Sequence, residues 1–479
     1  MCRASPRRMR NLGLYDVTKS FSRIRGEQLA LAAVCVAVAC SNRQTLSPPD
    51  PVTASSSPPR ACSGSTRYRY DVSALAQTVG HHYVYLAGKA VDWPMAERLA
   101  EEEADSVTSR KGLVAVLERF LDNLYDAHAT LRANTTASPR LVPSGLDVWA
   151  EWRKSDAVVT AVRAGYSAEK AGVYPGMRVL AINNVPIERA AEFRLGAAIR
   201  HPVPAPALDW ALLSALAGRR DVPRMLRVRD SSGVRDLAID RPADHATDAA
   251  AQEARVEFRQ LTDRPDATKR ADYYGYIRLN ALGDTLSITE FDSALSALRS
   301  TSGLIIDLRN TPGGGSTNVA EPILGRLITR TEAYQRVAPP GSTAYLRTVA
   351  PRGPWPYTAP IVVLVGRWTG SMGEGMAIGL DGMQRGTVVG TRMAGLAGSV
   401  EDFVLPCSGI GVALPTEQLL HINGTPRERW VPPVLIDLVA ERSQRPAPMV
   451  AGSPNVSIPN PSDLVFERGL RVLRKSLRP

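Results

Sequence analysis

The pattern of apolar and polar positions changes along the chain and divides it into several segments. Residues 29–39 form an unbroken apolar run, and residues 40–66 are rich in Ser and Pro without apolar periodicity. In residues 67–137 the apolar positions recur at the spacing of one helix face, as with Leu113 and Leu117. The pattern therefore predicts a flexible tether followed by an N-terminal helical segment.

Residues 138–243 change to short apolar runs separated by turn residues. Residues 158–162 and 178–182 are predicted strands, and the turn-forming pair Pro175-Gly176 lies between them. This pattern of short strands and turns predicts a small β domain inserted after the helical segment.

The β segment resembles a PDZ domain in the succession of residues 167–187, with Gly145, Leu146, Asp147 and Val148 ahead of it. In PDZ domains a Gly-Leu loop offers backbone N–H groups to the carboxylate of a peptide end, and the peptide adds a strand to the sheet edge. The resemblance implies that these four residues bind peptide. An unrelated small β domain is the alternative.

Residues 244–442 alternate apolar strands with helices, which is typical of a sheet layered against helices. The strands predicted in this segment include 274–279, 304–308 and 361–365. A helix is predicted over residues 372–380. Residues 443–479 are predicted to form a linker and a closing helix, capped by Ser462.

Composition narrows the class of protein. The 479 residues are 44% apolar and 22% charged, which supports folded cores and excludes a disordered, collagen-like or disulfide-dense chain. The net charge is +11, but basic residues are spread along the chain without an interleaved aromatic stripe, so nucleic acid is not an expected partner. Only seven of the basic residues are lysines.

The N-terminus has the features of an export signal. Residues 1–39 hold seven basic and two acidic side chains, and end in small residues directly before Cys40. The apolar run is too short to span a bilayer. Cys40 in this setting resembles the lipidated first residue of a bacterial lipoprotein, which implies a membrane anchor facing the periplasm. Plain secretion and an uncleaved anchor are the alternatives.

Two cysteines downstream of the predicted cleavage site, Cys62 and Cys407, can pair in an oxidising compartment. The sequence alone leaves open whether they meet.

Two glycine-rich turns follow apolar strands and are candidates for chemistry. Gly313, Gly314 and Gly315 leave their N–H groups unobstructed, which suits an anion, and the Lys-Ser/Thr ending of a phosphate-binding loop is missing. Ser371 lies between glycines at the start of a predicted helix, where the helix dipole favours negative charge. It is a candidate nucleophile, with an ordinary helix cap as the alternative.

The order of these segments, with residues 306–315 (IDLRNTPGGG) and 370–374 (GSMGE), resembles the C-terminal processing (tail-specific) serine peptidases and their tricorn-core relatives. The resemblance implies an α+β fold, in which a ClpP/crotonase-like peptidase core carries an N-terminal helical segment and an inserted PDZ-like β domain. The family nucleophile lies three residues before a Glu, which here points to Ser371 before Glu374.

The resemblance also implies an oxyanion hole formed by backbone N–H groups of Gly313, Gly314 and Met372. No metal and no organic cofactor are expected for this chemistry.

Histidine is the predicted base. One branch of the family uses a lysine in the loop after the next strand, but Leu396 stands there and no lysine occurs between Lys269 and Lys475. The other branch uses a histidine, and His128 matches its Asp-x-His motif. Neutral imidazole has a suitable pKa for accepting the serine proton. His421 is a weaker alternative.

The orienting group of the histidine departs from the family pattern. The tricorn group orients its histidine through a neighbouring Ser and a distant Glu, and Ala127 stands beside His128 here. Glu428 is a possible orienting acid, although Arg427 aligns better with the family's Glu. An arginine cannot accept an imidazole N–H.

These features together predict an exported serine endopeptidase that hydrolyses polypeptide substrates, captured through the PDZ-like domain. The missing lysine and Ala127 leave a second hypothesis, a catalytically silent PDZ-containing envelope lipoprotein that binds peptides.

Overall fold

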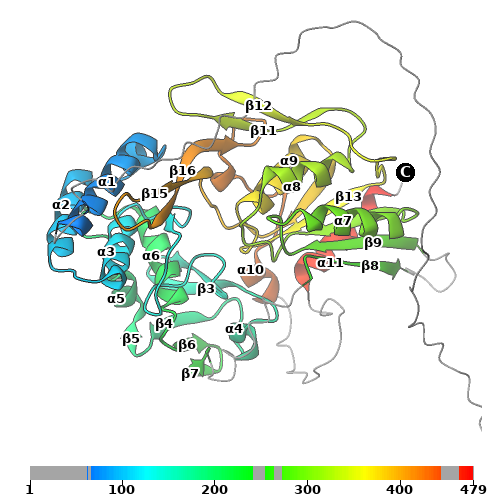
Figure 1. Ribbon diagram of the computed structural model, residues 1–479. Helices are drawn as coiled ribbons and strands as arrows, with labels where there is room; N and C mark the ends of the chain where they lie inside the picture. The colour runs from blue at the N-terminus through cyan, green and yellow to red at the C-terminus, as the bar shows by residue number, and fades with distance from the viewer. Residues whose placement is uncertain (1–61, 63–65, 241–253, 264–271, 444–462, 478–479) are drawn as a thin grey trace, which may run out of the picture. The chain divides into compact units, whose positions relative to one another are not determined.

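The computed structural model describes residue 62 and residues 66–240, 254–263, 272–443 and 463–477 (Figure 1). The predicted export signal, with Cys40 and most of the tether, lies outside the described residues. No described helix is both long enough and apolar enough to cross a membrane.

Helices open the described chain, as predicted. They are α1 (Arg67–His82), the short 3-10 helix η2 (Leu86–Gly88), α2 (Trp93–Asp105) and α3 (Arg110–Asp122). Ser109 caps α3 by accepting a hydrogen bond from the Gly112 amide at 3.1 Å. The apolar face of α3, with Leu113 and Leu117, is fully buried against α1 and α2.

The next segment forms a separate β domain, here called the insert domain (residues 138–240). Its strands are β2 (Val148–Arg153), β3 (Asp156–Val162), β4 (Arg178–Ile182), β5 (Val185–Pro186), β6 (Met225–Asp230) and β7 (Gly233–Ala238). Its helices are α4 (Ser167–Lys170), α5 (Ile187–Glu192) and α6 (Ala205–Ala217). The strand order β2-β3-β4-β6-β7, with β5 beside β4, leaves β2 at one edge of the sheet. The predicted strands 158–162 and 178–182 are confirmed, whereas α6 was not foreseen.

A mixed sheet with the order β17-β14-β13-β10-β9-β8 forms the centre of the remaining chain. Its strands are β8 (Val256–Asp263), β9 (Asp272–Leu279), β10 (Gly303–Asp307), β13 (Ile361–Val365), β14 (Gly386–Gly390) and β17 (Val434–Leu435). All neighbours are parallel except β8, which runs antiparallel to β9. The predicted strands are therefore confirmed, and the fold is mixed α and β.

Helices cover both faces of this sheet. They are α7 (Leu286–Ala297), α8 (Thr317–Gly325), α9 (Met372–Gly382), α10 (Leu438–Ser443), η5 (Arg427–Arg429) and α11 (Leu464–Ser476). Because successive strand residues point to opposite faces, Ile306 packs with α7, α8 and α9, while Ile305 packs with α11. The N-cap of α11 is Asp463, which accepts from the Phe466 amide at 3.0 Å; the predicted cap Ser462 lies outside the described residues.

A third sheet has the order β1-β16-β11-β12, with β15 also paired to β16. Its strands are β1 (Thr130–Leu131), β11 (Glu332–Ala338), β12 (Tyr345–Val349), β15 (Ser399–Val404) and β16 (Gly411–Leu420). The pairing of Thr130 with Ala413 fastens the turn after α3 to the hairpin of β15 and β16.

A disulfide bond between Cys62 and Cys407 secures the same hairpin. The amides of Cys407 and Ser408 also donate to the buried carboxylate of Asp71 in α1, at 2.8 and 2.9 Å. The pairing left open by the sequence is therefore present, and it ties the start of the described chain to the β15–β16 hairpin.

Candidate active site

Ser371 occupies the turn between β13 and α9, where a strand ends and a helix begins. Its φ of 51° lies in the left-handed region that side chains other than glycine rarely adopt. Non-glycine residues in such conformations are held there by their surroundings and are frequent at functional sites. The sequence prediction of a serine at the N-terminus of a helix is confirmed.

The triple-glycine loop lies against Ser371. A Cβ added to Gly313 would stand 3.6 Å from the Cβ of Ser371, and one added to Gly315 would stand 2.3 Å from the Cβ of Met372. Gly313 and Gly314 have φ values of 131° and 75°. Neither of their amides donates to a backbone carbonyl among the described residues. The loop therefore presents two uncommitted N–H groups beside the serine.

Glu374 fixes the serine turn from inside the protein. Its side chain is fully buried and accepts hydrogen bonds from the amides of Ser371 (2.8 Å), Gly395 (2.8 Å) and Leu396 (3.2 Å). Burial raises the pKa of Glu374 to about 7, against the opposing effect of Arg427 and the three amides. The predicted Glu three residues after the nucleophile therefore connects the serine turn to the loop after β14.

His128 lies in the turn between α3 and β1, beyond the end of the helix. Its Nδ1 is 2.7 Å from the carbonyl oxygen of Ala397. Since a carbonyl can only accept, Nδ1 carries the proton and Nε2 is left as an acceptor. Burial and the charge of Arg427 lower the pKa of His128. Both effects favour the neutral ring, and the contact with Ala397 leaves Nε2 as its acceptor nitrogen.

The loop of residues 395–397 contacts both predicted catalytic groups. Its amides bind Glu374, which holds the Ser371 turn, and its Ala397 carbonyl binds His128. Within the described residues, no hydrogen bond joins the Ser371 hydroxyl directly to the imidazole. Catalytic hydrogen bonds are often long without substrate and shorten when it binds.

Asp126 fixes the backbone of the histidine turn. Its carboxylate accepts from the His128 amide at 2.8 Å and from the Tyr83 hydroxyl at 2.6 Å. Asp126 and His128 lie beyond the end of α3, in a turn. Asp126 therefore positions the main chain and not the ring.

Glu428 does not occupy the position of an orienting acid, since the Nδ1 that it would bind faces Ala397. Its Oε2 is buried with no hydrogen-bond partner among the described residues. Burial raises its pKa. Its role as orienting acid stays a prediction that these contacts do not support.

His421 lies in a different environment from the two catalytic candidates. Its Nδ1 accepts from the Asn423 amide at 3.2 Å, and its ring stacks on Trp430. The carboxylate of Asp381, 3.2 Å from its Nε2, raises its pKa. These contacts give it a structural place in the turn after β16.

Arg427 is the residue that sequence reasoning passed over. Its guanidinium, only 2% exposed, donates to the carbonyls of Leu396 (2.9 Å) and Gly398 (2.7 Å), on either side of Ala397. The alignment of Arg427 with the family's Glu was the available signal. It was discounted because only direct contact between side chains was considered.

The predicted peptide-binding loop of the insert domain is engaged in internal contacts. The Gly145 amide donates to Leu141 at 2.6 Å, and the Leu146 amide donates to Pro143 at 3.2 Å. Val148 is buried in β2. A peptide carboxylate at this loop would have to replace these two hydrogen bonds.

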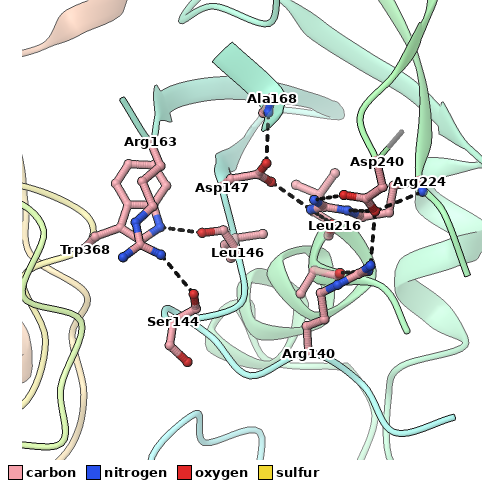
Figure 2. Close-up of polar contacts among 11 residues, drawn as sticks. Arg140, Ser144, Leu146, Asp147, Arg163, Ala168, Leu216, Arg224, Asp240 and Trp368 are labelled. Carbon is pink, nitrogen blue, oxygen red and sulfur yellow. Dashed lines mark hydrogen bonds and ion pairs between the residues drawn. The ribbon is translucent and has the colours of Figure 1, made fainter. Parts of the chain in front are cut away.

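Asp147 has a structural role in the same loop (Figure 2). Its carboxylate lies between the Ala168 amide (2.9 Å) and the guanidinium of Arg224 (2.8 Å), and Arg224 also pairs with Asp240. Arg140 joins this network through Asp240. The network fixes the loop to the rest of the insert domain.

Figure 2 also shows the same loop in contact with the peptidase segment. The indole of Trp368, 5% exposed, donates to the Leu146 carbonyl at 2.6 Å. Arg163 of the insert domain donates to the Ser144 carbonyl and to the side chain of Asn310, at 2.9 and 2.7 Å. The predicted peptide-binding loop therefore touches the turn before the nucleophile and the loop before the glycines.

Comparisons with known proteins agree with this geometry. The model of peptidase family S41 matches residues 273–433, which contain Ser371, the glycine loop and Arg427. The carboxyl-terminal-processing protease of Synechocystis sp. (strain ATCC 27184 / PCC 6803 / Kazusa) is 24% identical over 353 residues, or 71% of this chain and 72% of that protein.

Two solved structures share the fold. Mature CPAF complexed with lactacystin matches 86% of this chain and 98% of its own, with 16% identity and a TM-score of 0.55. The photosystem II D1 C-terminal processing protease matches 78% of this chain and 94% of its own, with 19% identity and a TM-score of 0.50. With these matches, residues 273–433 are a peptidase family S41 domain, and the chain is a serine-type peptidase.

Proposed function

We propose that this peptidase is an endopeptidase that cleaves polypeptides with Ser371 as nucleophile and His128 as general base. The observation that supports the pairing is the shared 395–397 loop, which binds the serine turn through Glu374 and the imidazole through Ala397. The position of the lysine base in the other branch is filled by Leu396, which is 4% exposed and apolar.

In the proposed reaction, Nε2 of His128 takes the proton of the Ser371 hydroxyl as the oxygen attacks the substrate carbonyl. The developing oxyanion accepts hydrogen bonds from the amides of Gly313 and Gly314, with the Met372 amide at the first turn of α9 as a third donor. The imidazolium then gives its proton to the leaving amine, and the acyl-enzyme forms. Water, activated by the same imidazole, hydrolyses the ester and regenerates the serine.

We further infer that the central sheet with α7, α8 and α9 is a ClpP/crotonase-like core and that the insert domain is a PDZ domain. The edge strand β2 supports a site to which a polypeptide end could add a strand, and binding of its carboxylate at the 145–148 loop would replace the two internal hydrogen bonds of that loop. The contacts of Trp368 with Leu146 mean that a bound peptide end would disturb the turn before Ser371.

Export and lipid anchoring at Cys40 belong to the same proposal, with the protein facing the periplasm. The Cys62–Cys407 disulfide supports it, because such bonds persist mainly in oxidising compartments. Fatty-acid labelling of cells that express the protein tests the anchor. Label should enter the native protein and be lost in Cys40→Ala, and equal labelling of both would refute it.

Cleavage of an unstructured polypeptide by the purified protein tests the catalytic assignment. Ser371→Ala and His128→Ala should each reduce kcat at least about 1000-fold, as for other serine peptidases. Two substitutions are matched controls. Ser109→Ala removes a helix-capping serine that is distant in sequence from Ser371, and His82→Ala changes an exposed histidine at the end of α1. Undiminished cleavage by either catalytic variant would remove that residue from the mechanism. No cleavage by the native protein across many polypeptides would favour a peptide-binding role.

A further inference from the structure

The carbonyl of Ala397 has an unusual task for a main-chain group. It lies 2.7 Å from Nδ1 of His128 and so sets both the tautomer and the direction of the ring. A carbonyl on a loop does this reliably only if the loop cannot rotate its peptide planes. Something must therefore hold the peptide units on both sides of Ala397.

Arg427 provides that restraint. One terminal nitrogen of its guanidinium donates to the carbonyls of both neighbours, Leu396 at 2.9 Å and Gly398 at 2.7 Å. The side chain is 2% exposed, so water does not compete for these bonds. Gly398 has a φ of 60°, a left-handed conformation that glycine adopts without strain. The arginine thus brackets the carbonyl that binds the imidazole.

The guanidinium of Arg427 interacts electrostatically with the carboxyl groups of Glu374 and Glu428. Among the described residues it forms no ion pair, and its Nε is buried without a hydrogen-bond partner. Its positive charge therefore acts on the groups around it, including His128 and Glu374.

We propose that Arg427 is a positioning residue for His128, acting through the carbonyl of Ala397. Where relatives orient the histidine with an acid, this chain uses a carbonyl held by a cation. The inference rests on the proposed function, in which His128 is the general base.

The charged groups facing the imidazole bear on its protonation. Asp126 precedes it in its own turn and favours the imidazolium, while Arg132 at the end of β1 and Arg427 from η5 disfavour it. Arg132 is half-exposed and pairs with Asp402, so its influence is screened. Removing the buried charge of Arg427 should therefore raise the pKa of His128.

The first test is steady-state kinetics on the purified protein. Arg427→Gln should lower kcat about 10- to 100-fold with little change in KM, because the base is misplaced while the substrate site is intact. The acid limb of the pH profile should shift to higher pH. Arg385→Gln is the control, since Arg385, although less buried than Arg427, also donates to carbonyls, those of Leu327, Tyr357 and Ala359. Equal effects of both variants on kcat and on the pH profile would overturn the proposal.

Arg427→Lys separates position from charge and serves if the glutamine variant does not fold. Lysine keeps the charge but lacks the rigid planar donor group. The pH profile should stay near that of the native protein, while kcat falls several-fold. A lysine variant with native kcat would overturn the role of the guanidinium geometry.

A third measurement does not depend on activity. Nitrogen-15 NMR of the histidine rings in Ser371→Ala protein reports the tautomer and pKa of His128, identified by its absence in a His128→Gln variant. The proton should reside on Nδ1, and adding Arg427→Gln should weaken that preference and raise the pKa. If activity survives His128→Ala, the proposed base is wrong, yet this spectrum still decides whether Arg427 orients the ring. An unchanged tautomer and pKa would refute the positioning role.

Discussion

Two arginines hold the two loops of the active site in different ways. Arg309, just before the glycine loop, pairs with carboxylates: Asp307 at 2.6 Å and Asp463, the N-cap of α11, at 2.7 Å. Within the part of the chain that the structure describes, the hydrogen bonds of Arg427 go to carbonyls of the 395–398 loop. The carboxylates neutralise the first arginine, whereas the charge of the second reaches His128 and Glu374. A salt bridge can therefore fix a loop without altering the electrostatics of the site, and a guanidinium bound to carbonyls does both.

Breaking the buried ion pair between Arg309 and Asp307 should have the largest effect on the stability of the protein. Asp307 is 1% exposed, and although burial favours its protonated form, Arg309 holds its pKa at about 2. Arg309→Met leaves that carboxylate with the Tyr276 hydroxyl at 2.7 Å as a remaining partner. We expect a loss of about 3–5 kcal/mol in the free energy of unfolding, measured with urea.

The control for that variant is an exposed pair of the same kind. Arg227 and Asp236 lie on the surface of the insert domain. Arg227→Met should leave the free energy of unfolding close to its native value, because solvent screens an exposed pair. Similar losses in both variants would mean that burial does not distinguish the two pairs.

Altering the carboxylate of Glu374, which links the Ser371 turn to the loop after β14, should have an intermediate effect on stability. Glu374→Gln keeps the volume, but it replaces with a donor one of the two carboxylate oxygens that together accept from three amides. The free energy of unfolding should fall by about 1–3 kcal/mol, and kcat should fall with it. Urea unfolding and steady-state kinetics on one preparation check both values, and native stability would show that the three amides find other partners.

The pH dependence of kcat/KM distinguishes the two arginines directly. A protonated His128 cannot accept the serine proton, so activity is lost as pH falls through its pKa. Because burial and Arg427 lower that pKa, the midpoint of the acid limb should lie below 6.5. Arg309→Lys, which keeps its paired charge, should leave the midpoint unchanged, unlike Arg427→Gln. A shift in the Arg309 variant would contradict local neutralisation.

The smallest effect on stability is expected at Asp463, the second carboxylate that pairs with Arg309. Asp463→Asn preserves a helix-capping side chain and leaves Arg309 its bond to Asp307. Its cost should be about 1 kcal/mol or less, measured by urea unfolding. A loss as large as that of Arg309→Met would show that α11, and not Asp307, is the main anchor of the loop.

The helices and strands, and the two candidate side chains Ser371 and His128, each have a local signal in the sequence. The strand 361–365, the glycine-flanked Ser371 and the Asp-x-His motif at His128 all follow from periodicity or motif. The position of the 395–397 loop between the Ser371 turn and His128 depends on tertiary packing. The sequence pattern shows only the order of these segments along the chain.

The orienting group of the histidine was not predictable. Every residue has a main-chain carbonyl like that of Ala397, so the residue type does not indicate which carbonyl binds the imidazole. Arg427 was excluded as a partner of the ring because it cannot accept a proton, which is correct but does not consider action through a carbonyl. Likewise, the burial of Trp368 against the insert domain depends on a contact between segments 222 residues apart.

The disulfide has a further consequence for the covalent integrity of the molecule. Cys62 and Cys407 are 345 residues apart, and the ring of chain they close contains both His128 and Ser371. A single peptide-bond cut anywhere in that ring opens it without releasing a fragment. A preparation nicked by its own activity should therefore run as one species on a non-reducing gel and as two after reduction. The two halves of the catalytic pair would remain on one covalent unit even after the chain between them is cut.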